Sequence, residues 1–357
     1  MNDSIHPHVT ILGSGQMGLV CASILAAPSP AKPAPAITIW SHSPEEAGEL
    51  TQTRKSDRLP GYILPDGIRV SSRLDDAVAH ATLIVSAIPV QFMRRVWTPL
   101  GRAGQGRTST KSSLPHDAAV VSVAKGIENT TLLRPSQIVA VALQDNPDAK
   151  PRGIAVLSGP TIASELARCL PATMIAASDL PVLAAELQTL FSSSWLRIYT
   201  SEDVLGVELA GASKNVIAIA AGILDGLQAG HNAKSALLAR GLAEITRLGT
   251  AMGASQETFF GLAGVGDLAT TCFSPEGRNR SCGEALGRGE KLDAYLARTT
   301  SVVEGVATTL SLVDLARKYR VDMPITTAVH GVLFQNVDPI EAISRLMSRE
   351  LKAERIG

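Results

Sequence analysis

The sequence predicts an α/β N-terminal domain built on a mainly parallel sheet, followed by an all-α C-terminal domain. Over the first 200 residues, short apolar runs of strand length recur between segments of helical character. The first run enters a glycine-rich turn and then an apolar helix, and from about Asp203 the apolar residues follow helical spacing with no convincing strand. A chain of 357 residues is long enough for two separate cores. We therefore expect one domain over residues 1–200 and a second over residues 201–357.

The composition argues against several classes of partner. Basic and acidic residues number 33 each and aromatic residues make up only 4% of the chain, so we expect neither a polyanion-binding surface nor a platform for stacked bases. The four cysteines form no CxxC pair, which predicts no metal site. Sparse cysteines, with no signal-peptide pattern and no uninterrupted apolar stretch of roughly 20 residues, predict a cytoplasmic protein without a membrane span.

The first predicted strand, Val9–Leu12, runs into Gly13-Ser-Gly-Gln-Met-Gly18, and a helix through Leu19–Ala26 follows. A strand, a GxGxxG turn and a helix in this order are typical of the dinucleotide-binding Rossmann fold. Gly13 permits the tight turn, Gly15 lets the backbone approach a pyrophosphate, and Gly18 permits close helix packing. The free amides and partial positive charge of the helix N-terminus would then bind the phosphates. This segment predicts a site for NAD or NADP.

The second predicted strand, Ala36–Trp40, ends in Ser41-His-Ser43. An NAD-selective Rossmann domain usually places an acid there for the ribose hydroxyls. The missing acid removes repulsion against a ribose phosphate, so NADP is slightly favoured over NAD, with His42, Arg54 and Lys55 as candidate contacts. An ordinary surface histidine is the alternative interpretation of His42.

Five further strands are expected over Leu83–Pro89, Ala118–Ala124, Ile154–Leu157, Pro171–Ala177 and Leu196–Tyr199. Lys125 comes directly after one of them, and the carboxyl ends of strands in an open α/β sheet face the ligand crevice. A surface charge at a loop tip is an equal alternative. Gly159 and Thr161 lead into a helix expected over Ile162–Arg168, whose free amides would complete an anion-accepting corner.

Lys214 lies in the apolar segment Gly206–Gly222. In a helix, three- and four-residue spacing places it on one face with Val207, Ala210, Gly211, Ile217, Ala218 and Ala221. Burial lowers the pKa of an ammonium group, which suits proton exchange near neutral pH. The alternative is a lysine that reaches out from the edge of the core.

Three polar signals follow in the second half. The glycine-rich turn Gly261–Leu268 presents Asp267, and a later turn places Arg278 beside Asn279. Arginine matches phosphate oxygens in a bidentate manner, and asparagine can donate and accept toward hydroxyls. Glu304 could accept hydrogen bonds from cofactor ribose or amide groups. Each signal alone is also compatible with a solvated surface or, for Glu304, with an acid at a helix start.

Together these segments resemble bacterial-type NAD(P)-dependent glycerol-3-phosphate dehydrogenase. The matching pieces, in family order, are Gly13–Gly18, Lys125–Glu128, Leu157–Thr161, Gly206–Leu209 with Lys214–Asn215, Gly261–Leu268, Arg278–Arg280 and Val303–Gly305. The resemblance implies a Rossmann domain, a helical substrate domain and a homodimer. It also implies reversible, NAD(P)H-dependent reduction of dihydroxyacetone phosphate to sn-glycerol 3-phosphate, which supplies phospholipid synthesis.

The resemblance further implies residue roles. Lys214 would be the catalytic proton donor and acceptor. The substrate would be held by Lys125, Gly159, Thr161, Lys214, Asp267, Gly277, Arg278 and Asn279. The cofactor would be contacted by Gly13, Gly15, Gln16, Met17, Gly18, His42, Lys125, Ala163, Arg278, Val302 and Glu304. Gln16-Met17 stands where the family usually has Ser-Trp, and Gly277 where it has serine, so backbone amides would serve at both places.

Two alternatives stay open at this stage. A keto-acid reductase of the ketopantoate type also combines a Rossmann domain, a helical domain and a lysine, but its substrates end in a carboxylate. A non-catalytic dinucleotide sensor would keep the fold without the reaction. The Gly261–Leu268 turn and Arg278-Asn279 favour a phosphorylated substrate, and the full set of polar residues argues against a sensor.

Overall fold

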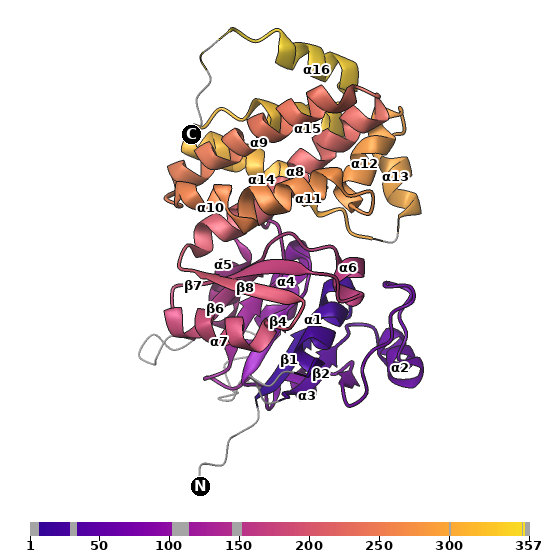
Figure 1. Ribbon diagram of the computed structural model, residues 1–357, viewed down its shortest axis with the longest axis vertical. Coiled ribbons are helices and arrows are strands. Elements are labelled where there is room, and N and C mark those ends of the chain that lie inside the picture. Colours follow the sequence, from indigo (N-terminus) through magenta and orange to yellow (C-terminus); the bar gives the residue numbers. More distant parts are fainter. Residues whose placement is uncertain are drawn as a thin grey trace.

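The molecule consists of a sheet flanked by helices and a group of helices stacked against one end of that sheet (Figure 1). The computed structural model describes residues 7–353 apart from 29–33, 102–113, 145–151, 300 and 352. The chain passes from the sheet half into the helical half after Ser201, so the two halves follow one another in the sequence.

The sheet has eight strands in the order β3-β2-β1-β4-β5-β6-β7-β8. They are β1 (His8–Leu12), β2 (Ala36–Trp40), β3 (Arg69–Ser71), β4 (Leu83–Ser86), β5 (Ala119–Ser122), β6 (Ile154–Ser158), β7 (Ala172–Ser178) and β8 (Leu196–Ser201). Neighbours run parallel except β6 and β7, so the sheet is mainly parallel, as predicted. The strand order reverses between β1 and β4. Ligands bind outside the carboxyl ends of the strands at such a reversal.

Helices cover both faces of the sheet because strand residues alternate between the faces. In β1, Val9 and Ile11 belong to a core with Leu19 of the first helix, whereas Leu12 belongs to a second core with Trp97 and Ile138. The helices of this half are α1 (Gln16–Ala26), α2 (Pro44–Thr53), α3 (Leu74–Val78), α4 (Val90–Trp97), η1 (Thr98–Leu100), α5 (Pro135–Leu143), α6 (Ala163–Ala167) and α7 (Pro181–Phe191).

The second half is helical, and the described residues after β8 contain no strand. Its helices are α8 (Val204–Gly226), α9 (Gly230–Met252), α10 (Gln256–Phe260), η3 (Leu262–Gly266), α11 (Asp267–Phe273), α12 (Arg278–Gly287), α13 (Leu292–Arg298), α14 (Glu304–Tyr319), α15 (Pro324–Phe334) and α16 (Pro339–Met347). α9, α11, α12 and α14 all pack against α8, which makes α8 the central helix.

The burial of α8 is more complete than predicted. The sequence predicted one buried face that carries Lys214, but every residue from Gly206 to Leu224 is buried, including Glu208 on another face. A helix that is surrounded by others on all sides has no solvent-facing stripe. By length and composition α8 could cross a membrane, yet its most apolar window is 94% buried inside the fold, as expected for a core helix.

One strand was not predicted, and some predicted elements differ in their limits. β3 was not predicted, because a three-residue edge strand with an arginine and a serine carries little apolar signal. The strand predicted over Leu83–Pro89 ends at Ser86, because Pro89 caps the start of α4. The helix predicted over Ile162–Arg168 is limited to Ala163–Ala167, with Ile162 in extended conformation as its cap.

Candidate active site

Three charged side chains meet where α8 crosses the carboxyl edge of the sheet. Lys125 comes from the loop after β5, Lys214 from the middle of α8, and Asp267 from the first position of α11. Asp267 Oδ1 lies 2.8 Å from Lys214 Nζ, and Oδ2 lies 2.5 Å from Lys125 Nζ. The three side chains are 15%, 7% and 1% exposed, in chain order. One buried carboxylate therefore bridges the buried ammonium group of Lys214 and the partly buried one of Lys125.

Neighbouring groups fix the orientation of this cluster. Lys125 Nζ donates to the carbonyl of Gly159 at 3.1 Å, and Thr161 Oγ1 donates to the same carbonyl at 3.1 Å. Lys214 Nζ donates to Thr271 Oγ1 at 2.5 Å, and Thr271 donates in turn to the carbonyl of Asp267 at 2.7 Å. Five predicted site residues, from both halves of the molecule, thus form one connected network.

Gly159 has to be a glycine in this arrangement. Its φ is +132°, and a Cβ added there would lie 3.1 Å from the carbonyl oxygen of Thr173 in β7. The chain can therefore turn sharply after β6 and present the Gly159 carbonyl to Lys125.

The environment of Lys214 shifts its proton affinity. Burial lowers the pKa of Lys214 to about 8; Asp267 opposes this shift and Lys125 adds to it. An amine with this pKa exists in both protonation states near neutral pH, so it can donate and accept a proton. The lowered pKa predicted from the sequence is thus found, and desolvation is its main cause.

The starts of α12 and α14 adjoin this cluster. The buried Asn279 accepts a hydrogen bond from the backbone of Gly305 at 2.9 Å, which ties the two helix starts together. Burial raises the pKa of Glu304, and the charges of Arg278, Lys125 and Lys214 oppose that shift. Arg278 is exposed at the first position of α12, with Gly277 as the cap. Glu304 is therefore within electrostatic reach of all three cations.

Val302 and Ala163 contribute no polar side chain to this region. Val302 is 43% exposed just before α14, and Ala163 is the first residue of α6. Either could offer apolar contact or a backbone group to a ligand.

The glycine-rich turn fits a dinucleotide. A Cβ on Gly13 would lie 2.7 Å from the carbonyl oxygen of Ala87, and one on Gly18 would lie 2.0 Å from that of Gly13. Both glycines are therefore required by close packing. Gly15 differs, since no atom of the described residues lies within 4 Å of its added Cβ, and no described side chain caps α1 there. The open space and uncapped amides suit a pyrophosphate.

The remaining predicted cofactor residues lie at the edge of this turn. Gln16 and Met17 begin α1, and Gln16 Nε2 donates to the carbonyl of Arg58 at 2.7 Å. His42 is exposed just after β2. These residues lie at the start of α1 and the end of β2 and take no part in the lysine network.

Sequence reasoning assigned no role to several polar residues of this region. Thr271 lies one helical turn after Asp267 on the same face of α11, and this four-residue spacing was a usable signal. Asn215 follows Lys214 and is 3% exposed, and its Nδ2 finds no hydrogen-bond partner among the described residues. The Ser158 hydroxyl, at the end of β6, is likewise buried with no hydrogen-bond partner in the part of the chain that the structure describes. A ligand that offers acceptors would satisfy such groups.

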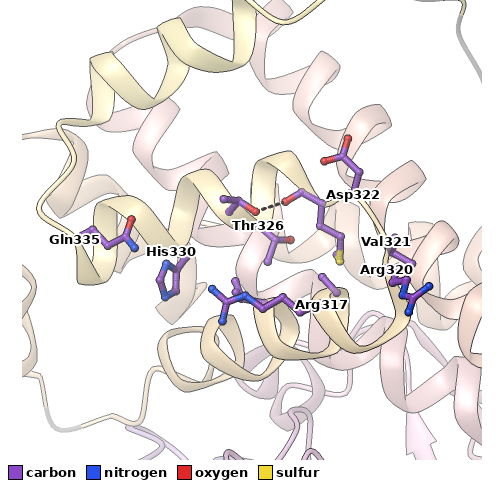
Figure 2. Close-up of a pocket in the computed structure, with 11 residues that line it drawn as sticks. Arg317, Arg320, Val321, Asp322, Thr326, His330 and Gln335 are labelled. Carbon is purple, nitrogen blue, oxygen red and sulfur yellow. Dashed lines mark hydrogen bonds between the residues drawn. The ribbon is translucent and has the colours of Figure 1, made fainter.

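Two cavities lie elsewhere, and their described linings include none of the predicted site residues. One, of about 450 Å³, opens between α14 and α15, where Figure 2 shows Arg317, Thr326 and His330 around it. The other, of about 800 Å³, lies against α6 and β8.

A mainly parallel sheet with a glycine-rich dinucleotide turn, next to a helical half that contributes a buried lysine, defines a class of protein. This class is the two-domain, nicotinamide-dependent oxidoreductases.

Comparison with known proteins identifies the family within this class. The N-terminal region of NAD-dependent glycerol-3-phosphate dehydrogenase matches residues 8–184, and the C-terminal region matches residues 203–344. Glycerol-3-phosphate dehydrogenase (NAD(P)+) of Geobacter sp. strain M21 is 41% identical over 98% of this chain and 99% of its own length. A crystal structure of glycerol-3-phosphate dehydrogenase from Coxiella burnetii, 32% identical, covers 96% of this chain and 99% of that one with a TM-score of 0.87. The chain belongs to the NAD-dependent glycerol-3-phosphate dehydrogenase family.

The keto-acid reductases share only the fold. A PanE/ApbA family ketopantoate reductase from Ralstonia eutropha JMP134 is 15% identical, with a TM-score of 0.58 over 94% of this chain and 99% of that one. The comparisons therefore favour neither a keto-acid reductase nor a sensor.

Proposed function

We propose that the chain catalyses the reversible reduction of dihydroxyacetone phosphate to sn-glycerol 3-phosphate with NAD(P)H. The observation that carries the proposal is the buried bridge of Asp267 between Lys125 and Lys214, in a chain of this family. When bound, the reduced nicotinamide supplies the hydride for the C2 carbonyl.

Lys214 is the proposed proton donor. In the reduction, its ammonium group donates a proton to the oxygen of C2 as that oxygen becomes an alkoxide. In the reverse reaction the neutral amine takes the proton back. A pKa of about 8 supports both directions near neutral pH. Asp267 and Thr271 hold the amine in place, since both contact Nζ directly.

Lys125 and the start of α12 are the proposed substrate anchors. Lys125 adds positive charge where negative charge develops on the C2 oxygen, and Arg278 and Asn279 bind the phosphate or its neighbouring hydroxyls. Binding of the non-reacting phosphate positions the carbonyl for transfer. Gly159, Thr161 and Gly277 complete the substrate site through backbone and hydroxyl groups.

The proposed dinucleotide site extends along the edge of the sheet. It comprises Gly13, Gly15, Gln16, Met17, Gly18, His42, Lys125, Ala163, Arg278, Val302 and Glu304. The open space over Gly15 supports pyrophosphate binding at the start of α1.

The wider setting is proposed from the family. The domains span residues 1–200 and 201–357, the protein is a cytoplasmic homodimer, and its product supplies phospholipid synthesis.

Oxidation of NADH and of NADPH, followed in parallel with dihydroxyacetone phosphate, tests this function. We expect turnover with at least one cofactor. Lys214→Met, which keeps the side-chain volume, should reduce turnover by roughly a hundred- to ten-thousandfold because a positioned proton donor is lost. Binding of ADP-ribose should stay unchanged, which shows that the variant is folded.

Two results would contradict the proposal. Turnover of ketopantoate in place of dihydroxyacetone phosphate would indicate a keto-acid reductase, and dinucleotide binding without turnover of either substrate would indicate a sensor. Near-normal activity of Lys214→Met would remove Lys214 from the proton-transfer role.

A further inference from the structure

A carboxylate lies beside the end of β2, although Ser41-His-Ser43, which directly follows the strand, contains no acid. Ser43 caps α2 by accepting from the backbone of Glu46 at 3.1 Å, and this places Glu46 on the first turn of the helix. Glu46 Oε2 lies 3.1 Å from Ser14 Oγ and 3.4 Å from Ser41 Oγ, and the two hydroxyls lie 2.8 Å apart. Ser14 is the second residue of the glycine-rich turn. The Ser43 cap thus places the Glu46 carboxylate beside the end of β2, where the strand itself carries no acid.

Glu46 is paired with an arginine from the segment between α2 and β3. Arg58 Nε donates to Glu46 Oε1 at 3.1 Å, and its NH2 group also contacts that oxygen. The backbone of Arg58 is held as well, because its carbonyl accepts from Gln16 at the start of α1. The side chains are 43% and 35% exposed for Arg58 and Glu46, so the pair borders the solvent where a ligand can reach it.

The position of the pair corresponds to the adenosine ribose. In Rossmann domains the crevice beside the glycine-rich turn and the end of the second strand holds this ribose. A carboxylate there accepts hydrogen bonds from the ribose hydroxyls, whereas an arginine binds a 2′-phosphate. This chain holds both groups at once, and the carboxylate occupies the arginine.

The charge state of Glu46 decides whether this place favours ribose hydroxyls or a 2′-phosphate. Partial burial acts to raise the pKa of Glu46, but Arg58, Ser14 and His42 hold it below its usual range, so the carboxylate is ionised at neutral pH. A 2′-phosphate, with about two negative charges, would be repelled by Glu46 and would have to displace it from Arg58.

Two of the other cations expected to favour NADP, Arg54 and His42, do not change this balance. The guanidinium group of Arg54 donates to the carbonyls of Leu64, Pro65 and Ile68, so it is engaged by the segment that precedes β3. His42 contributes to the field that keeps Glu46 ionised.

We infer that Glu46 reads the ribose 2′ position, favours NAD(H) over NADP(H), and keeps Arg58 from binding a 2′-phosphate. This reverses the slight preference for NADP expected from Ser41-His-Ser43. The inference rests on the proposed function only for the assumption that the glycine-rich turn binds a nicotinamide dinucleotide.

Calorimetry with ADP-ribose and 2′-phospho-ADP-ribose tests the inference without any turnover. We expect the wild-type protein to bind ADP-ribose more tightly. Glu46→Gln keeps the shape and removes the charge, so Arg58 becomes free. The ratio of the two dissociation constants should then move toward the 2′-phosphate by about tenfold or more, as for one charge-assisted hydrogen bond.

Two further variants make the test specific. Arg58→Ala in the Glu46→Gln background should abolish that gain. Glu45→Gln is the matched control, because Glu45 lies on the same turn and contacts the Ser43 side chain instead, and its ratio should equal that of the wild type.

Several results would overturn the inference: an unchanged ratio in Glu46→Gln, a gain that persists without Arg58, a wild-type preference for 2′-phospho-ADP-ribose, or no binding of either compound. The outcome is separable from the proposed function. A shifted ratio without reduction of dihydroxyacetone phosphate would support the role of Glu46 and reject the reaction. Reduction of dihydroxyacetone phosphate with an unchanged ratio in Glu46→Gln would support the reaction and reject the role of Glu46.

Discussion

At the scale of single residues, the site depends on one lysine kept between its two protonation states. Desolvation favours the neutral amine of Lys214, whereas Asp267 at 2.8 Å favours the ammonium form. Neither influence alone would leave the pKa at about 8, because burial without a counter-ion would lower it further and an ion pair in water would leave it high. The balance between these two influences makes the residue suited to reversible proton transfer.

This balance predicts opposite pH profiles for the two directions. In the proposed mechanism reduction needs the protonated Lys214, so its kcat should fall as the pH rises through about 8. Oxidation of sn-glycerol 3-phosphate needs the neutral amine, so its kcat should rise over the same range. Asp267→Asn removes the group that raises the pKa, so the falling limb of the reduction profile should move to lower pH. Stopped-flow rates between pH 6 and pH 10 would measure the limb. An unmoved limb in the variant would mean that another group titrates there.

At the scale of elements, the start of α12 is positioned by close packing against α8. Glycines spaced by four residues face each other across the two helices. A Cβ on Gly222 of α8 would lie 1.9 Å from the carbonyl oxygen of Arg280, and a Cβ on Gly283 of α12 would lie 1.9 Å from that of Ile219. Glycine at these positions lets the backbones of α8 and α12 touch. This contact holds the start of α12, with Arg278 and Asn279, near Lys214.

Gly283→Ala should therefore disturb both stability and substrate binding. The methyl group would collide with backbone, which cannot give way as a flexible side chain can. We expect a loss of roughly 1–3 kcal/mol in the free energy of unfolding, typical of overpacking, and a raised KM for dihydroxyacetone phosphate. Urea unfolding and steady-state kinetics measure the two effects. Gly48→Ala is the control, since no atom of the described residues lies within 4 Å of its added Cβ on α2. Wild-type KM in Gly283→Ala would contradict this role of the packing.

At the scale of the whole molecule, the halves are joined by a buried acid on α8. Glu208 accepts from the backbone and hydroxyl of Ser136 at 2.7 Å each, and it pairs with Arg134 at the start of α5. Burial raises the pKa of Glu208, and Arg134 and Ser136 oppose that shift. The Lys125–Asp267 pair also spans the halves, so at least two ion pairs join them.

Glu208→Ala should destabilise the protein by roughly 3–5 kcal/mol, because it leaves Arg134 largely buried without its partner. Glu208→Gln should cost less, since it can still accept from Ser136. The exposed pair of Arg317 and Asp314 provides the comparison, and Arg317→Ala should cost no more than about 1 kcal/mol. Urea unfolding measures these free energies. Equal losses in Glu208→Ala and Arg317→Ala would refute the role of Glu208 in joining the two halves.

The sequence by itself determined what depends on near neighbours. The first strand, the GxGxxG turn and its helix have signals within 20 residues, and the all-α second half follows from periodicity alone. The burial of Lys214 was also predictable, because apolar residues surround it along α8. The order of the motifs was sufficient to indicate the family.

Only the tertiary structure decided what depends on docking. Asp267 and Lys125 are 142 residues apart, and nothing local tells either residue which partner it will meet. The antiparallel direction of β7 and the full burial of α8 likewise depend on how the elements stack. At the end of β2, the Ser43 cap positions Glu46 beside Ser14 of the glycine-rich turn, so the carboxylate at this place comes from α2 and not from the strand end. Strand and helix patterns depend on spacing along the chain, whereas a site depends on where distant side chains converge.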